Sequence, residues 1–156
     1  MADFFGMGRP GGGLDIRTIT VRLEAHAAIA KGDVVAVADE VSTSNEDTIP
    51  HFYKTKNISS GDASVDDNEF GILAVALESV ASGEKGLFAL SGIVQALVSG
   101  TPAVGVGVSG KVTTNDLIAP TAGDKIVAFM LETGSNGAEL DWVMFDGVSG
   151  FGQKLA

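Results

Sequence analysis

The chain contains no cysteine, and it has few basic or aromatic residues. Without cysteine there is no disulfide framework, no thiolate metal cluster and no cysteine nucleophile, which fits a reducing compartment. None of its apolar runs approaches the roughly 18 residues that a membrane-spanning helix requires. The first residues also lack the basic region and apolar stretch of a secretory signal. We therefore expect a soluble protein without a membrane partner.

Acidic residues outnumber basic residues two to one. The 156 residues include 10 Lys and Arg against 20 Asp and Glu, which gives a formal net charge of −10. A phosphate backbone is bound by displacing its counterions with Lys and Arg. Here the cations are scattered and form no basic stripe with interleaved aromatic residues. Nucleic acid is therefore excluded as an expected partner, and the acidity is explained most simply by solubility.

After residue 13 the chain has the sequence pattern of β-strands. In residues 16–25, apolar positions alternate with Thr, Arg and Glu, which is the period of a half-buried strand. Further β-rich runs are separated by breaks about every 8–12 residues, the spacing of a barrel or sandwich. Only residues 24–32 have the composition of a short helix. We predict an all-β fold, a small Gly-rich β-barrel or sandwich. The further runs are residues 32–39, 70–79, 86–92, 93–100, 102–108, 111–114, 124–133 and 139–147.

One domain is expected at this length. We assign residues 14–148 to a single β domain, residues 149–156 to a C-terminal tail and residues 1–13 to a flexible N-terminal arm. Six residues of the arm are Gly or Pro, and Gly loses the most conformational freedom on ordering. Large apolar side chains on such an arm are typical of a segment that orders against a partner. A free terminus with aromatic residues by chance is the alternative. The side chains concerned are Phe4, Phe5 and Met7, with Arg9 and Pro10 beside them.

Two segments of the chain repeat each other. Residues 72–79 (ILAVALES) and 126–133 (IVAFMLET) are identical at four of eight positions and similar at the rest. Each continues through a Gly-containing turn into a second apolar strand. We interpret them as two copies of a strand–turn–strand unit that form pseudo-symmetric halves. Coincidence between short β segments is the alternative. A looser similarity places residues 30–37 beside residues 99–106.

Residues 105–114 (GVGVSGKVTT) have the glycine spacing of a nucleotide-binding loop. A P-loop needs a helix after its glycines and a Ser or Thr after its lysine. Here Val112 follows Lys111, and Pro120 interrupts the β-rich run behind them. A dinucleotide site would need a βαβ unit that this pattern does not supply. We predict a strand without a nucleotide, with Val104, Val106 and Val108 on one face, Gly105 and Gly107 on the other, and a hairpin turn at Ser109 and Gly110.

No other pattern indicates a cofactor, a metal ion or a catalytic group. The two histidines, His26 and His51, form no metal-ligand spacing. Residues 62–69 alternate acidic and polar side chains like a calcium loop, but Asp67 and Leu73 stand where that loop has its Gly and its Glu. We predict a solvated acidic loop there. Asp33 and Asp124 beside glycines are explained as turn residues.

Several segments together resemble the small capsid decoration, or cement, proteins of tailed bacteriophages. The resemblance rests on AKGDVVAVAD, FGILAVALESVASGEKGLFALSGIVQALV, and SGKVTT followed by DKIVAFMLET, and it covers roughly residues 16–147. Leu73 and Ala74 replace an expected Gly-Val pair. The polar insert at residues 40–68 is longer than the pattern needs, so it is either a capsid contact or a projecting loop.

The resemblance implies a non-enzymatic β domain in the virion, on the outer surface of the capsid. Such proteins clamp neighbouring major capsid subunits against the pressure of packaged DNA, often as trimers or dimers. The major capsid protein is then the expected partner, together with other copies of the chain, a trimer before a dimer. The arm residues Phe4, Phe5, Met7, Arg9 and Pro10 are the candidate capsid-binding site.

Two other functions stay open. One is a different virion module, such as a tail or head-fibre component, with or without glycan contacts. Sugar sites stack on exposed aromatic rings, and the chain has only Tyr53 and Trp142 beside its phenylalanines. Trp142 lies in an apolar run, where we expect it to pack in the core. The other is a small β-barrel enzyme with Asp33 or Glu78 as an acid–base group.

Overall fold

The computed structural model describes residues 18–25, 27–38, 54–56, 72–110 and 115–152, all of which are strands, turns or irregular segments. It contains no helix in these ranges, and so none that is long and apolar enough to cross a membrane. Residues 24–32, which have the composition of a short helix, form none where the chain is described, because Ile29 pairs with Val80 and a turn follows. The eight strands are β1 (Ile19–Glu24), β2 (Val34–Ala38), β3 (Lys54–Lys56), β4 (Leu73–Ala76), β5 (Lys85–Ala96), β6 (Gly107–Val108), β7 (Ala128–Met130) and β8 (Asp141–Asp146).

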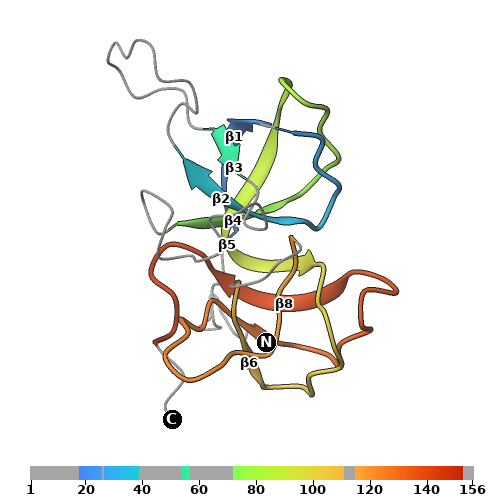
Figure 1. Ribbon diagram of the computed structural model, residues 1–156, viewed down its shortest axis with the longest axis vertical. Coiled ribbons are helices and arrows are strands. Elements are labelled where there is room, and N and C mark those ends of the chain that lie inside the picture. The colour runs from blue at the N-terminus through green and yellow to red at the C-terminus, as the bar shows by residue number, and fades with distance from the viewer. Residues whose placement is uncertain (1–17, 26, 39–53, 57–71, 111–114, 153–156) are drawn as a thin grey trace, which may run out of the picture.

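Five of the strands close into a small barrel, the first barrel. They are hydrogen-bonded in the order β1-β3-β2-β4-β5, and β1 also pairs with β5, so the sheet returns on itself (Figure 1). The closure is narrow at one seam, because β1 and β3 share the single pair Glu24 and Lys54. β3 lies within the insert predicted at residues 40–68. The chain there supplies a strand that pairs parallel to β1 and antiparallel to β2, which a purely polar pattern did not indicate.

The second barrel starts from the strand that ends the first. β5 is a single strand of 12 residues where the sequence predicted two. Its second half pairs with β8, and β7 and β6 follow in the same sheet. Residues 117–118 then bridge back to Val98 and to Ser109, which closes this ring as well. The two barrels thus lie one above the other with β5 running between them (Figure 1).

The predicted pseudo-symmetry is confirmed by equivalent hydrogen bonds in the two barrels. In the first barrel, the Leu87 N–H donates to Glu78 Oε1 at 2.9 Å. In the second, the Trp142 N–H donates to Glu132 Oε1 at 2.9 Å. In each case the carboxylate of the repeated Glu takes the place of a backbone carbonyl at the end of the strand ladder. This shared hydrogen bond explains why both copies of the repeat have Glu at this position, Glu78 and Glu132.

The turns that enter β2 and β6 are equivalent in the same way. The Gly32 N–H donates to the Ala76 carbonyl at 2.8 Å, and the Gly105 N–H donates to the Met130 carbonyl at 2.8 Å. Both glycines have a positive φ, +92° and +81°, as the third residue of a type II turn requires. The counterpart of residues 30–37 is therefore residues 103–110, four residues beyond the segment that the sequence similarity indicated.

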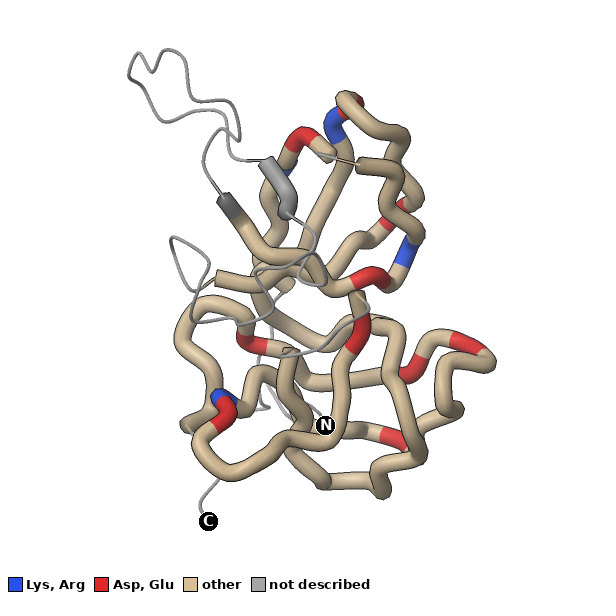
Figure 2. The backbone as a smooth tube through the Cα atoms, viewed as in Figure 1, with Lys and Arg blue, Asp and Glu red and all other residues tan. Residues whose placement is uncertain are grey.

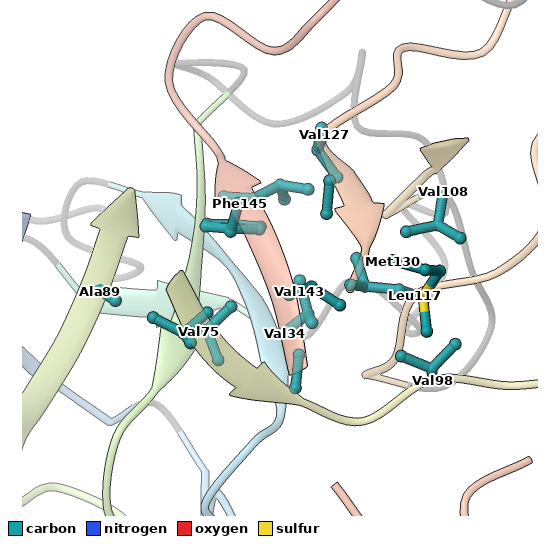
Figure 3. Packing of buried hydrophobic residues seen from close by; sticks show 14 of the residues in the cluster. Val34, Val75, Ala89, Val98, Val108, Leu117, Val127, Met130, Val143 and Phe145 are labelled. Carbon is teal, nitrogen blue, oxygen red and sulfur yellow. The ribbon is translucent and has the colours of Figure 1, made fainter. Parts of the chain in front are cut away.

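Each barrel is filled by side chains that alternate inward along its strands. The first barrel encloses one apolar cluster, and a second, larger cluster fills the second barrel. This larger cluster continues onto the outer face of the first barrel, so the two units share a core (Figure 3). The first cluster consists of Leu23, Ala25, Ile29, Val35, Val37, Ala74, Ala76, Val80 and Phe88. The outer-face residues in the shared core are Val34, Ala36, Leu73, Val75 and Ala89.

Phe88 is the largest side chain in the first barrel, and it is fully buried. We expect Phe88→Ala to lower the free energy of unfolding by about 3–5 kcal/mol, because it removes a buried ring and leaves a cavity. Urea unfolding followed by circular dichroism measures the change. Ile19→Ala is the matched control, since Ile19 is 57% exposed and its truncation is expected to cost less than about 0.5 kcal/mol. Equal losses for the two variants would contradict the assignment of the core.

Candidate interaction surface

The arm residues proposed from the sequence lie outside the described residues. Phe4, Phe5, Met7, Arg9 and Pro10 belong to residues 1–17, for which the structure gives no placement. The acidic loop at residues 62–69 is also outside the described ranges. The capsid-binding arm therefore stays a prediction.

The glycines at residues 105–110 serve turn geometry and close packing. Gly105 occupies the left-handed position of the turn into β6, and the Val106 N–H closes that turn onto the Ala103 carbonyl at 3.1 Å. A Cβ on Gly110 would overlap the side chain of Leu73 in the shared core. Within the described part of this segment no helix follows the glycines, so no helix N-terminus is available to hold a phosphate.

The details predicted for this strand were partly wrong. Val104 and Val106 lie in and just after the turn and are exposed, whereas Val108 is buried, so the three valines do not share a face. Ser109 pairs with Ile118 and is not part of a hairpin turn. The alternation of Val and Gly over residues 104–108 is the pattern of a strand, but residues 104–105 form a turn and only residues 107–108 form β6.

The acidic residues singled out in the sequence, Asp33, Glu78 and Asp124, have structural partners. Asp33 Oδ2 accepts from the Ala30 N–H at 2.9 Å, and Asp124 Oδ2 accepts from the Thr121 N–H at 2.8 Å. These are the turn roles predicted for both residues. The Glu78 carboxylate accepts the Leu87 N–H at the end of the strand ladder. Among the described residues, no three His, Asp or Glu side chains come together in a way that could hold a metal ion.

Burial raises the pKa of Asp33 above its ordinary value of 3.8, although hydrogen bonds from the Ala30 backbone and the Asn115 side chain act in the opposite direction. The folded state therefore takes up a proton at higher pH than the unfolded state does. The stability linked to this group is fully present below pH 3.8 and is lost as the pH rises through the raised value.

We expect this linkage to disappear in Asp33→Asn. The difference in free energy of unfolding, wild type minus variant, is predicted to fall as the pH is raised in steps from below 3.8. Urea titrations of both proteins at each pH give this difference, in which the contributions of all other carboxylates cancel. A difference that is constant or that rises over this range would contradict the assignment.

Six large apolar side chains lie on the outside of the second barrel, and the described surface also exposes Ile19, Val104, Val106 and Val148. We call the six side chains the apolar face, which consists of Ile93, Phe129, Leu131, Trp142, Met144 and Phe151. Ile93, Leu131, Trp142 and Phe151 are 39%, 42%, 44% and 39% exposed, and Phe129 and Met144 are partly exposed. The prediction that Trp142 packs in the core was wrong, because strand alternation turns its neighbours Asp141 and Val143 inward and Trp142 outward.

Strand register places these side chains next to one another. Ile93 is paired with Met144, and Met144 with Phe129, so the three form a row across β5, β8 and β7. In the adjacent row, the Leu131 N–H donates to the Trp142 carbonyl at 3.0 Å. Directly paired side chains on one face of a sheet lie within contact distance. The apolar face is therefore continuous over three strands.

The chain near residue 151 completes the apolar face. The Phe151 N–H donates to the Ile126 carbonyl at 2.7 Å, and the Ile126 N–H donates to the Gly152 carbonyl at 2.7 Å. These bonds hold the Phe151 ring edge-on to Phe129, with ring centroids 5.0 Å apart. Residues 151–152, assigned from the sequence to the C-terminal tail, thus pair with the strand segment that leads into β7.

Part of the corresponding face of the first barrel is covered. The equivalent of Phe129 is Val75 and that of Met144 is Ala89, as the register of the repeat shows. Both are fully buried in the shared core, because the second barrel packs on them. The equivalents of Leu131 and Trp142 are Leu77 and Leu87, which are only partly buried, so the cover is confined to the part of the face at Val75 and Ala89.

Charge is distributed unequally between the barrels. Among side chains that the structure describes, the first barrel carries Arg22, Lys31 and Lys85, and the second carries Lys125 alone (Figure 2). The second barrel has six described acidic residues against four in the first. They are Asp116, Asp124, Glu132, Glu139, Asp141 and Asp146.

Comparison with known proteins gives a likeness in fold. No protein-family model and no curated protein matches the chain. Among solved structures, it is similar to the head fiber gp8.5 N base of bacteriophage phi29, with a TM-score of 0.51 and 13% sequence identity. The match covers 85% of this chain and 97% of that chain. Nearly the whole of that base therefore has a counterpart in the present fold.

Proposed function

We propose that the chain is a structural, non-enzymatic protein of a bacteriophage virion, attached to the outer surface of the head. The observation that supports this best is the likeness in fold to a phage head-fibre base over 97% of that chain. The sequence motifs that resemble capsid decoration proteins lead independently to the same location. A net charge of −10 suits a position outside the shell better than contact with packaged DNA.

Attachment to the head is assigned to the N-terminal arm. Phe4, Phe5 and Met7 offer apolar anchors on a segment rich in Gly and Pro, which can lie along the surface of a neighbouring subunit. An extended segment can also add a strand to an exposed sheet edge of that neighbour. Because a head offers many equivalent sites, individually weak contacts of an oligomer reinforce one another. The major capsid protein is the proposed partner.

Deletion of residues 2–13 is expected to abolish head binding and leave the fold intact. The measurement is co-sedimentation with purified heads, with circular dichroism and urea unfolding of the free protein as the check on folding. A triple variant, Phe4→Ser with Phe5→Ser and Met7→Ser, keeps the length of the arm and is expected to lose most of the binding, at least about tenfold. Unchanged occupancy of heads by either protein would refute the arm proposal.

Two functions on the head surface follow from the two resemblances. A cement protein bridges neighbouring capsid subunits and stabilises the DNA-filled head, whereas a fibre base anchors another component and need not stabilise the shell. We favour cementing, because the sequence motifs that carry the decoration-protein resemblance span both barrels.

Heat release of packaged DNA separates the two functions. Heads saturated with the protein are expected to release DNA at a temperature several degrees higher than bare heads, because ligand that binds only the intact shell stabilises it by mass action. Fluorescence of a DNA-binding dye during a temperature ramp records the release, and heads mixed with the arm deletion serve as the control. Full occupancy with no shift in temperature would replace cementing by the fibre-base function.

A further inference from the structure

The loop between β7 and β8 contains Asn136 followed by Gly137, a pair of residues with a reactivity of its own. The backbone nitrogen after an asparagine can attack the side-chain amide, and glycine permits this most readily because it has no side chain to hinder the approach. Asn136 is the only one of the five asparagines that precedes glycine, since the others precede Glu, Ile, Glu and Asp. Both residues are exposed, so water reaches them. The pair is therefore a candidate site of deamidation.

Asn136 and Gly137 are the central residues of a tight turn. Their φ angles are +59° and +77°, and the Ala138 N–H donates to the Ser135 carbonyl at 3.3 Å, as in a type I′ turn. Such a turn holds the ψ angle of Asn136 at about +30°, which places the Gly137 nitrogen on the far side of the Cα–C bond from Cβ. Cyclisation requires the nitrogen and Cβ on the same side of that bond. The closed turn therefore opposes the reaction.

The Asn136 side chain is also tethered. Its Oδ1 accepts the Gly100 N–H at 2.7 Å, which joins this loop to the loop between β5 and β6. The same two loops meet where the Gly134 N–H donates to the Pro102 carbonyl at 2.9 Å. The Asn136 Cγ cannot approach the Gly137 nitrogen until the amide is free to rotate. The reaction thus needs a local opening that breaks the turn and the tether, both of which lie in loops.

The chain contains one further pair that is open to the same cyclisation, Asp146 followed by Gly147. Here the attacking nitrogen is engaged, because the Gly147 N–H donates to the Leu90 carbonyl at 2.9 Å. The backbone is also closely packed, since a Cβ on Gly147 would overlap the carbonyl of Leu73. Within the described part of the chain, no hydrogen bond engages the Gly137 N–H. Asn136 is therefore the more accessible of the two sites.

We propose that Asn136 is a deamidation site of the native protein, and that opening of its turn and of the Gly100 tether controls the rate. The Gly137 nitrogen, having lost its proton to base, adds to the Asn136 Cγ, and the bond from Cγ to Nδ2 breaks. Ammonia leaves after taking a proton from water, and a succinimide remains. Water then opens the ring at either carbonyl to give aspartate or isoaspartate, so amide and water become acid and ammonia. This chemistry is independent of head attachment and is tested on the free protein.

The two products differ in their effect on the loops. Aspartate keeps an oxygen that accepts the Gly100 N–H. Isoaspartate carries the main chain through Cβ and Cγ, and the added backbone atom is incompatible with the turn between Ser135 and Ala138. We expect isoaspartate to free the β7–β8 loop from the β5–β6 loop, so that the Gly100 amide exchanges its hydrogen faster.

Peptide mapping during incubation in mildly alkaline buffer tests the site. The tryptic peptide 126–154 contains Asn136 as its only asparagine. Replacement of NH₂ by OH raises the mass of this peptide, and fragment ions locate the change. We expect Asn136 to convert before any other asparagine. The folded chain is expected to react between about tenfold and about a thousandfold more slowly than the chain in urea, because the rate follows the population of the opened turn.

Three results of this measurement would overturn the proposal. Earlier conversion at another asparagine would move the site. Equal rates in the folded chain and in urea would show that the turn does not control the reaction. A folded chain that reacts more slowly than the expected range would require global unfolding rather than a local opening.

Two matched glycine variants test the tether. Gly100 and Gly83 both have a φ of +83°, and a Cβ on either meets no atom within 4 Å, so alanine causes the same left-handed strain at each without a clash. Gly100→Ala strains the residue that donates to Asn136, and we expect it to raise the rate in the folded chain at least about threefold. Gly83→Ala strains a turn of the first barrel and is expected to leave that rate unchanged.

Circular dichroism and urea unfolding check that both variants fold, and both are expected to react like the wild type in urea. Equal acceleration by Gly100→Ala and Gly83→Ala would show that general stability sets the rate. No acceleration by Gly100→Ala would show that the tether does not set it. Either result overturns the proposal.

Discussion

The burial of the outer face of the first barrel against the second is the interaction on which the rest of the structure depends. Val34, Leu73 and Val75 point away from the interior of their own barrel, yet they are fully buried because the second barrel's core continues onto them. Without that cover, β2 and β4 would present an apolar surface to water. The two barrels are therefore one folding unit, held together by a shared core and by the continuous strand β5.

Duplication explains most of the local features of the chain. The same turn, with a positive-φ glycine in third position, enters β2 and β6, and the same glutamate closes the strand ladder in each barrel. Where the copies differ, their environment differs. The positions of Val75 and Ala89, which lie under the other barrel, are occupied in the second copy by the larger Phe129 and Met144, which are open to solvent.

The arm and the apolar face are apolar surfaces of different kinds. The arm is an extended segment whose apolar anchors are a property of the sequence. The apolar face is a rigid patch whose side chains are positioned by three strands and by the pairing of Phe151 with Ile126.

The all-β class, the strand positions near β1, β2, β4 and β8, and the repeat at residues 72–79 and 126–133 were predictable from the residues, because they depend on local alternation and on turn residues. The sequence also argued against a nucleotide site at residues 105–114, because no helix pattern follows the glycines. The fold was needed to show that β3 lies inside the polar insert, that Trp142 faces outward and that Val104 lies in a turn. Each of these depends on pairing between segments far apart in the chain, and a one-residue change of register reverses which side chains are buried.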